Sequence, residues 1–278
     1  MSFKTVLLAV GVGQDDREID RAAKIAEALG AHLSVLTLGI APPPPSSPYG
    51  VVSNDIWASE IQDGQGAAQD FATGVASRLR ARGLSSSVMS QYIDRATVAT
   101  IVARSARYAD VTLITPEAEG VDLLQAWVTN GALFESGRPV VLLPSADTQF
   151  PNVSRVMIAW DASVEASKAV RDAVGLMKTA DEVHAVLIDP VPSFEGHGPE
   201  PGADLATYLG RHGISATIHR LPREGRDVAD LLQRTAIDLD ADLMVMGGFG
   251  HSRLRQRIFG GTTTSTLRAS RVPVLMAH

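Results

Sequence analysis

The chain has 278 residues, of which 45% are hydrophobic and 20% are charged, and its net charge at pH 7 is -6. This composition is typical of a folded globular protein, and the negative charge gives no bulk attraction to nucleic acid or to anionic membranes. The chain has no cysteine, which excludes disulfides, thiolate catalysis and cysteine-ligated zinc and fits a reducing, cytoplasmic location.

The first predicted element is a short apolar strand over residues 5–11. The acidic residues Asp15, Asp16 and Glu18 follow it closely, so we interpret it as a strand and not as a signal peptide. No stretch of the sequence reaches 18 consecutive apolar residues, so no membrane-spanning helix is expected. An alanine-rich helix over residues 16–29 and a second apolar strand over residues 33–38 complete the first strand-helix-strand unit.

The same order of elements then recurs about 150 residues later. The matching segments are residues 5–11 and 156–161, 16–29 and 163–177, 33–38 and 183–188, 109–114 and 241–246, and 138–143 and 272–276. Each half reads as strands alternating with helices, which predicts a parallel sheet covered on both faces. We therefore expect an α/β protein with two tandem doubly wound, Rossmann-like domains, each a mainly parallel five-stranded sheet flanked by helices. The predicted domains are residues 1–148 and 152–278, joined by a linker near residues 145–154.

The most informative stretch follows the predicted strand over residues 243–246. That strand ends on Gly247-Gly248-Phe249-Gly250, a basic segment follows, and Gly260-Gly261 then opens a hydroxyl-rich segment with Thr262 and Thr263. Glycines allow close backbone approach, and a helix start adds free N–H groups, which together suit a polyphosphate. The alternative is that these are ordinary turn glycines followed by a helix cap.

The spacing Gly247-x2-Gly250-x9-Gly260 resembles the nucleotide-binding signature of the universal stress protein family, G-x2-G-x9-G-[S/T]. Gly261 departs from that signature, and Thr262 or Thr263 could supply the hydroxyl instead. The resemblance implies a stress-response sensor or regulator that binds ATP or a related adenine nucleotide, with Mg accompanying the phosphates. The nucleotide-binding residues that it implies are Ala159, Trp160, Asp161, Ile188, Met246, Gly247, Gly250, Gly260, Gly261, Thr262 and Thr263.

Two of these residues have a second interpretation. Asp161 corresponds to an aspartate that lies by the nucleoside in the family, but it could equally be the N-cap of the helix that follows. Ile188 corresponds to a residue against the adenine, but it could also be a core residue. Asp161, Asp189 and Gly247 all end predicted strands, so we expect them on one rim of the sheet.

The first half is expected to be a copy that does not bind nucleotide. Gly11 replaces the aspartate, Thr115 replaces Gly247, and the carboxylates of Glu117 and Glu119 would repel phosphate. Trp127, near the position that matches Gly260, would fill the phosphate space. Universal stress protein domains typically dimerise through their last strand, so the resemblance implies that the apolar residues 140–143 and 274–276 pair antiparallel and make an internal pseudo-dimer. A further homodimer is left open.

The sequence contains no G-x-x-x-x-G-K-[S/T], H-E-x-x-H or G-x-S-x-G motif, and its histidines have no metal-ligand spacing. No catalytic residues and no protein metal site are therefore predicted. Two alternatives to a nucleotide-binding sensor stay open: a slow ATPase or phosphotransferase at the same pocket, and a nucleotide-free protein-interaction module.

Overall fold

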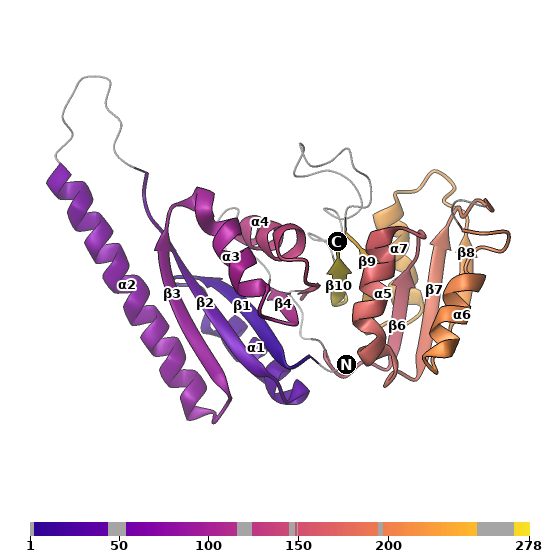
Figure 1. Cartoon of the computed structure of the whole chain (residues 1–278), viewed down its shortest axis with the longest axis horizontal. Helices are drawn as coiled ribbons and strands as arrows, with labels where there is room; N and C mark the ends of the chain where they lie inside the picture. Colours follow the sequence, from indigo (N-terminus) through magenta and orange to yellow (C-terminus); the bar gives the residue numbers. More distant parts are fainter. Residues whose placement is uncertain are drawn as a thin grey trace, which may run out of the picture. The chain divides into compact units, whose positions relative to one another are not determined.

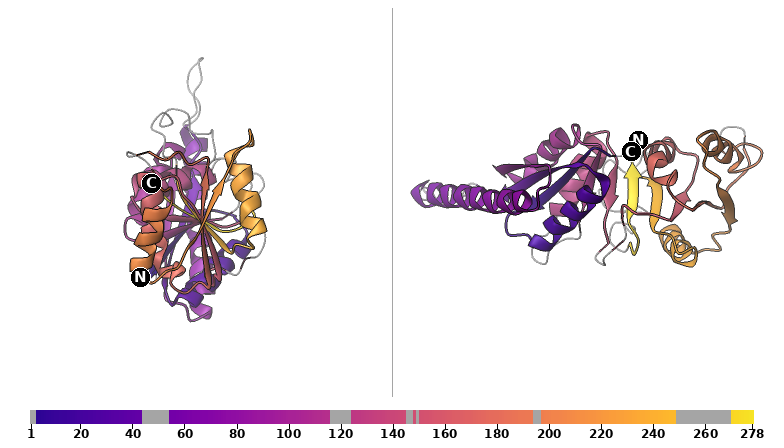
Figure 2. Two further views of the ribbon diagram at one scale, coloured as in Figure 1. Left: turned by 90° about the vertical axis from the view of Figure 1, so that its right-hand side faces the viewer. Right: turned by 90° about the horizontal axis from the view of Figure 1, so that it is seen from below.

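The computed structural model describes residues 3–43, 54–115, 124–144, 148, 150–193, 197–248 and 270–278. These residues divide into two compact units, an N-terminal unit of Phe3–Ser136 and a C-terminal unit that contains Gly137–His278 (Figures 1 and 2). The predicted ligand residues of the second glycine segment lie outside the described residues: Gly250, Gly260, Gly261, Thr262 and Thr263.

The N-terminal unit is a parallel sheet of four strands in the order β3-β2-β1-β4. Its strands are β1 (Thr5–Gly11), β2 (His32–Ile40), β3 (Ser86–Ile93) and β4 (Val111–Ile114). Its helices are α1 (Asp16–Leu29), α2 (Asn54–Ala81), η1 (Arg95–Thr97), α3 (Val98–Ala106), α4 (Leu124–Thr129) and η2 (Asn130–Glu135). The predicted strand-helix alternation and the first helix are thereby confirmed.

The C-terminal unit has the strand order β5-β10-β9-β6-β7-β8, and every pair is parallel except β5 with β10. Its strands are β5 (Val140–Leu142), β6 (Arg155–Ala159), β7 (Glu182–Ile188), β8 (Thr217–Leu221), β9 (Leu243–Gly247) and β10 (Val274–Ala277). Its helices are α5 (Val164–Met177), α6 (Ala203–Arg211) and α7 (Val228–Asp238). The central strands are buried, as expected for a sheet covered on both faces.

The antiparallel pairing of β5 with β10 joins Val140 to Met276 and Leu142 to Val274. This pairing confirms the predicted contact between the two apolar segments. Because β5 pairs with β10, it belongs to the C-terminal unit, and the compact units divide after Ser136, ahead of the boundary of the sequence repeat. The repeat boundary at residues 148–152 and the internal pseudo-dimer stay predictions.

A repeated carboxylate contact ties the strands of each unit together. In the N-terminal unit, Asp110 Oδ2 accepts the backbone N–H groups of Lys4 and Thr5 at 2.7 and 2.9 Å. In the C-terminal unit, Asp242 Oδ2 accepts two consecutive N–H groups at the start of β6, at 2.8 and 2.9 Å. The duplication seen in the sequence therefore extends to individual hydrogen bonds.

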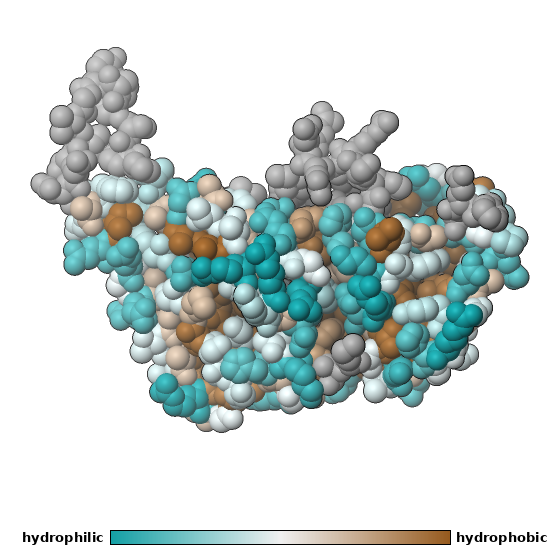
Figure 3. Space-filling view, viewed as in Figure 1, coloured by the Kyte–Doolittle hydropathy of each residue, from teal (hydrophilic) through white to brown (hydrophobic). Residues whose placement is uncertain are grey.

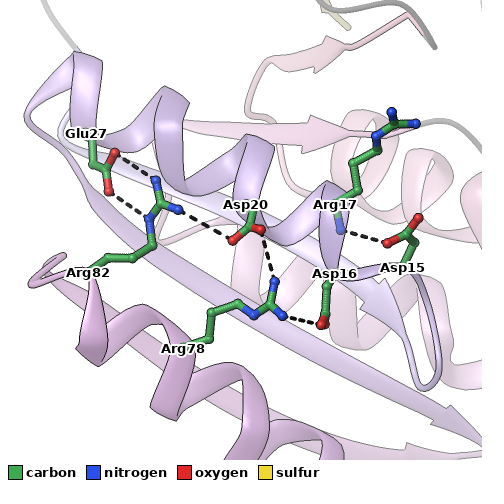
Figure 4. A network of polar contacts seen from close by, with 7 residues as sticks. All are labelled: Asp15, Asp16, Arg17, Asp20, Glu27, Arg78 and Arg82. Atoms are coloured by element: carbon green, nitrogen blue, oxygen red, sulfur yellow. Dashed lines mark hydrogen bonds and ion pairs between the residues drawn. The ribbon is translucent and has the colours of Figure 1, made fainter.

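Ion pairs fix the C-terminal part of α2 beside α1 (Figure 4). Arg82 Nε donates to Glu27 at 2.9 Å, Arg78 Nη1 donates to Asp20 at 3.0 Å, and Arg78 also pairs with Asp16. The hydrogen bond from Arg82 lowers the pKa of Glu27. Because these side chains are substantially exposed, the network contributes modest stability and mainly orients α2.

The described surface is mixed in character. On the face shown in Figure 3, polar residues cover most of the surface and apolar residues form small groups between them. Among the described residues, no helix combines the length and apolar character needed to span a bilayer.

A histidine pair on adjacent strands predicts an acid-sensitive C-terminal unit. His184 Nε2 donates to Glu182 Oε2 at 3.1 Å, which leaves His184 Nδ1 to accept from His219 Nε2 at 3.1 Å. Burial, and then the neighbouring His184, lower the pKa of His219 below its ordinary value. The unfolded chain therefore binds more protons at this position, and the stability that comes from neutral His219 is lost as the pH falls below about 6.5.

We expect the denaturation midpoint of the C-terminal unit to decrease as the pH is lowered below about 6.5. In a His219→Gln variant this decrease should be smaller. His212→Gln, at the end of α6, is the control and should keep the full pH dependence. Identical pH profiles for wild type and His219→Gln would contradict the assignment.

Candidate functional site

The carboxyl ends of β6, β7 and β9 form one rim in the C-terminal unit. Ala159 at the end of β6 is in register with Met246 on β9 and with Val186 on β7. The N–H of Trp160 continues this pairing by donating to Val186 O at 2.9 Å. The structure therefore brings together Ala159, Trp160 and Met246, residues that are far apart in the sequence, with Gly247 directly after Met246.

Asp161 leaves the end of β6 in a tight turn. Ala162 has a φ of 61°, and Asp161 Oδ1 accepts the N–H of Ser163 at 3.0 Å. Ser163 is the residue that caps α5, since its Oγ accepts the N–H of Ala166 at 3.1 Å. The interpretation of Asp161 as the N-cap is therefore wrong. Asp161 is exposed, and its second carboxylate oxygen makes no hydrogen bond within the described part of the chain.

Gly247 is required by packing as well as by any ligand. A Cβ atom on Gly247 would lie 2.6 Å from the backbone nitrogen of Ala166 and 3.0 Å from the carbonyl carbon of Glu165. The first turn of α5 therefore lies directly against the end of β9, and only glycine leaves room for it. The sequence pattern predicted close backbone approach at this position, and the close neighbour that the structure shows is a helix of the same unit.

The start of the glycine segment is held by the last residues of the chain. Gly248 donates its N–H to Ala277 O at 2.9 Å, and His278 Nδ1 donates to Gly248 O at 2.9 Å. Lys168, on α5, donates to the backbone carbonyl of His278. Sequence reasoning missed these contacts, because a single histidine distant from the motif carries no spacing signal.

Ile188 is half-buried at the end of β7, beside a loop that carries two arginines. Asp189 has a φ of 45°, and its Oδ1 accepts the N–H of Arg223 at 3.0 Å. Arg223 Nε in turn donates to Arg226 O at 2.6 Å. Arg226 also pairs with Glu224 of the same loop at 2.8 Å, and neither arginine was predicted as a site residue. Within the described ranges, no cluster of three metal-binding side chains is present.

At the equivalent rim of the N-terminal unit, the described side chains make contacts with one another. Gln14 Oε1 accepts the N–H of Gly11 at 3.0 Å, and Gln14 Nε2 donates to Thr115 Oγ1 at 3.3 Å. Gln125 Nε2 donates to Thr115 O at 2.7 Å. A Cβ atom on Gly11 would lie 2.9 Å from a methyl group of Leu124. The N–H of Gly11 and the hydroxyl and carbonyl of Thr115 thus already have hydrogen-bond partners within the unit.

Trp127 lies on α4 of the N-terminal unit, with the guanidinium of Arg95 stacked 5.6 Å from its ring centroid. This cation–π contact gives the indole a partner within the protein. Glu117, Ala118 and Glu119 lie outside the described residues, so the predicted effect of their charge stays a prediction.

Comparison with known proteins identifies the C-terminal half. Residues 152–278 match the Universal stress protein family. They form a universal stress protein domain. This match spans both the rim residues and the glycine spacing. Universal stress protein Slr1230 from Synechocystis is 28% identical over 142 residues, which are 50% of this chain and 46% of that protein. The chain thus spans about half the length of this curated relative.

Two solved structures share the fold over nearly the whole chain. A universal stress protein from Archaeoglobus fulgidus superposes with a TM-score of 0.70, and the alignment covers 100% of this chain and 96% of that protein's chain. For a proposed universal stress protein from Pseudomonas aeruginosa UCBPP-PA14 the TM-score is 0.61, and the alignment covers 99% of this chain and 92% of that protein's chain. Both are 18% identical to this chain, so they show the fold alone.

Proposed function

We propose that the C-terminal unit binds ATP or a related adenine nucleotide, and that this binding makes the protein a stress-response sensor or regulator. The observation that carries the proposal is the family match over residues 152–278, which contain both the rim and the glycine spacing. The rim is the place where parallel α/β sheets bind ligands. The reducing, ATP-containing cytoplasm is the compartment in which this proposal places the protein.

The proposed contacts follow from the chemistry of the rim. The exposed carboxylate of Asp161 accepts hydrogen bonds from the ribose hydroxyls, and the half-buried Ile188 offers an apolar surface for the adenine. The phosphates extend toward the segment that Gly247 and Gly248 begin. Magnesium enters with the phosphates, since it commonly binds through substrate phosphates with few protein ligands.

An Asp161→Asn variant tests this proposal. Asparagine keeps the oxygen that accepts the N–H of Ser163, so the turn and the thermal stability should not change. The charge-assisted bonds to ribose are lost, and we expect the affinity for adenosine to fall about 10-fold or more, since a hydrogen bond to a charged group contributes about 1.5–3 kcal/mol.

Calorimetric titration with adenosine and with ATP measures this change. Gln14→Ala, in the N-terminal unit, is the control and should bind like wild type. A wild-type protein that binds neither ligand would contradict nucleotide binding altogether and favour the interaction module. Phosphate release from bound ATP would instead favour the slow ATPase.

A further inference from the structure

Strand β3 is an unprotected edge of the N-terminal unit. It is the outermost strand of the sheet order β3-β2-β1-β4 (Figure 1). Its sequence, SSVMSQYI, is eight residues long and has no charge, proline or glycine. Natural proteins usually protect such edges with short strands, charged residues, proline or bulges, because a free edge pairs readily with another strand.

The corresponding edge of the C-terminal unit shows the usual protection. Strand β8 has five residues, Arg220 places a charge on it with 44% of the side chain exposed, and Pro222 follows its last residue. The two halves of a duplicated chain thus differ at the same edge, and β3, unlike β8, is suited to pairing.

Backbone geometry shows which groups of β3 are free. The carbonyls of Ser85 and Ile93 accept N–H groups from the β2 side at 2.9 Å. Because backbone direction alternates along a strand, the odd-numbered residues of β3 face β2 and the even-numbered residues face away. The outward residues are Ser86, Val88, Ser90 and Tyr92. No described residue hydrogen-bonds to their backbone N–H or C=O groups.

We propose that β3 pairs antiparallel with β3 of a second copy of this chain. One register joins all the outward residues in hydrogen-bonded pairs: Ser86 with Tyr92 of the second copy, and Val88 with Ser90 of the second copy. This register places Met89 on the two-fold axis, opposite its own equivalent. Met89 is 49% exposed, and the pairing buries it against an identical side chain.

Helix α2 leaves the Met89 face open. Ser90 Oγ donates to Ala68 O on α2, and the ring of Tyr92 lies close to Gly64. These contacts place α2 on the face that carries the even-numbered side chains. Since side chains alternate between faces, Met89 lies on the opposite face.

The charges of α2 favour the same arrangement. Ser90 is level with Ala68 and Tyr92 with Gly64, so an axis through Met89 passes close to the level of Asp70. Two-fold symmetry then sets Glu60, in the acidic first half of α2, level with Arg80 of the second copy, while Arg78 stays paired with Asp16 and Asp20 of its own α1. Asp70 of the two copies repel across the axis, which offsets part of this attraction.

Sedimentation and light scattering over a concentration series test the proposal. Wild type is expected to associate to a dimer, and Met89→Lys to halve the solution mass, because two ammonium groups then meet at the axis. Tyr108→Lys is the control, since Tyr108 is 83% exposed in the same unit and distant from β3 in sequence. A monomeric wild type, or a Met89→Lys protein that stays a dimer, would overturn the proposal.

Cross-linking tests the register on a background without cysteine. Residues opposite each other in a non-hydrogen-bonded pair have Cα atoms about 4.5 Å apart, which is within disulfide range. Met89→Cys should therefore form a covalent dimer on mild oxidation. Gln91→Cys, on the same face, meets Ser87 of the second copy and should not cross-link to itself. Equal cross-linking of the two variants would rule out this register.

Discussion

A Gly247→Val variant is expected to lose nucleotide binding and to destabilise the C-terminal unit by about 3 kcal/mol, the upper end of the usual cost of overpacking. The added Cβ would lie 2.6 Å from the backbone nitrogen of Ala166. A flexible side chain could move away from such a contact, but the first turn of α5 cannot move without disturbing the cap at Ser163. The displaced turn would carry Asp161 with it, since Asp161 Oδ1 bonds to Ser163.

Thermal unfolding with and without ATP, and calorimetry well below the melting temperature, separate the two effects of this variant. Gly210→Ala on α6 is the matched control in the same unit, because no described atom beyond its chain neighbours and the adjacent backbone of its own helix lies within 4 Å of the added Cβ. That change should raise stability by about 0.5–1 kcal/mol and leave binding intact. Wild-type stability in Gly247→Val would show that α5 does not pack against β9 as described.

Most of the fold could be predicted from the internal repeat and from the alternation of strands and helices in the sequence. Alternating apolar strands and amphipathic helices allow few solutions other than a parallel sheet, so the residues that end β6 and β9 had to meet at one rim. The antiparallel partners β5 and β10 could also be predicted, because the family that the sequence resembles dimerises through its last strand and both runs are apolar.

Local side-chain choices could not be predicted in the same way. Asp161 and Ser163 are both good N-cap residues two positions apart, and the sequence alone does not say which carboxylate or hydroxyl reaches the helix N–H groups. The structure assigns the cap to Ser163, because its Oγ accepts the N–H of Ala166, whereas Asp161 Oδ1 accepts the N–H of Ser163 itself. The contact of His278 with Gly248 depends on strands brought together only by the folded sheet.

The prediction that the N-terminal unit binds no nucleotide rested on only some of the contacts at its rim. The sequence showed Gly11 and Thr115 where the second half has Asp161 and Gly247. It did not show that Gln14 reaches across to hydrogen-bond with both Gly11 and Thr115, because glutamine is a common exposed residue and its partner lies 101 residues away.

These contacts predict one nucleotide per chain, bound in the C-terminal unit. At the rim of the N-terminal unit the N–H of Gly11 already has a partner, and Leu124 lies within 2.9 Å of where a Cβ atom on Gly11 would be. A nucleotide there would have to displace Gln14 and Leu124 without a carboxylate to replace their contacts. The rim of the C-terminal unit instead offers the exposed Asp161, with an oxygen that no described residue uses.

Calorimetric titration with ATP should therefore give a stoichiometry of one for wild type and for Gln14→Ala, while Gly247→Val should show no saturable binding. If the N-terminal unit held a second site, Gly247→Val would still bind one equivalent, since its change is confined to the C-terminal unit. Two equivalent sites in wild type, or one surviving site in Gly247→Val, would contradict the prediction. A single site that is lost in Gly247→Val would instead support the N-terminal unit as a copy that binds no nucleotide. Its own glutamines and Leu124 would then be the residues that occupy its rim.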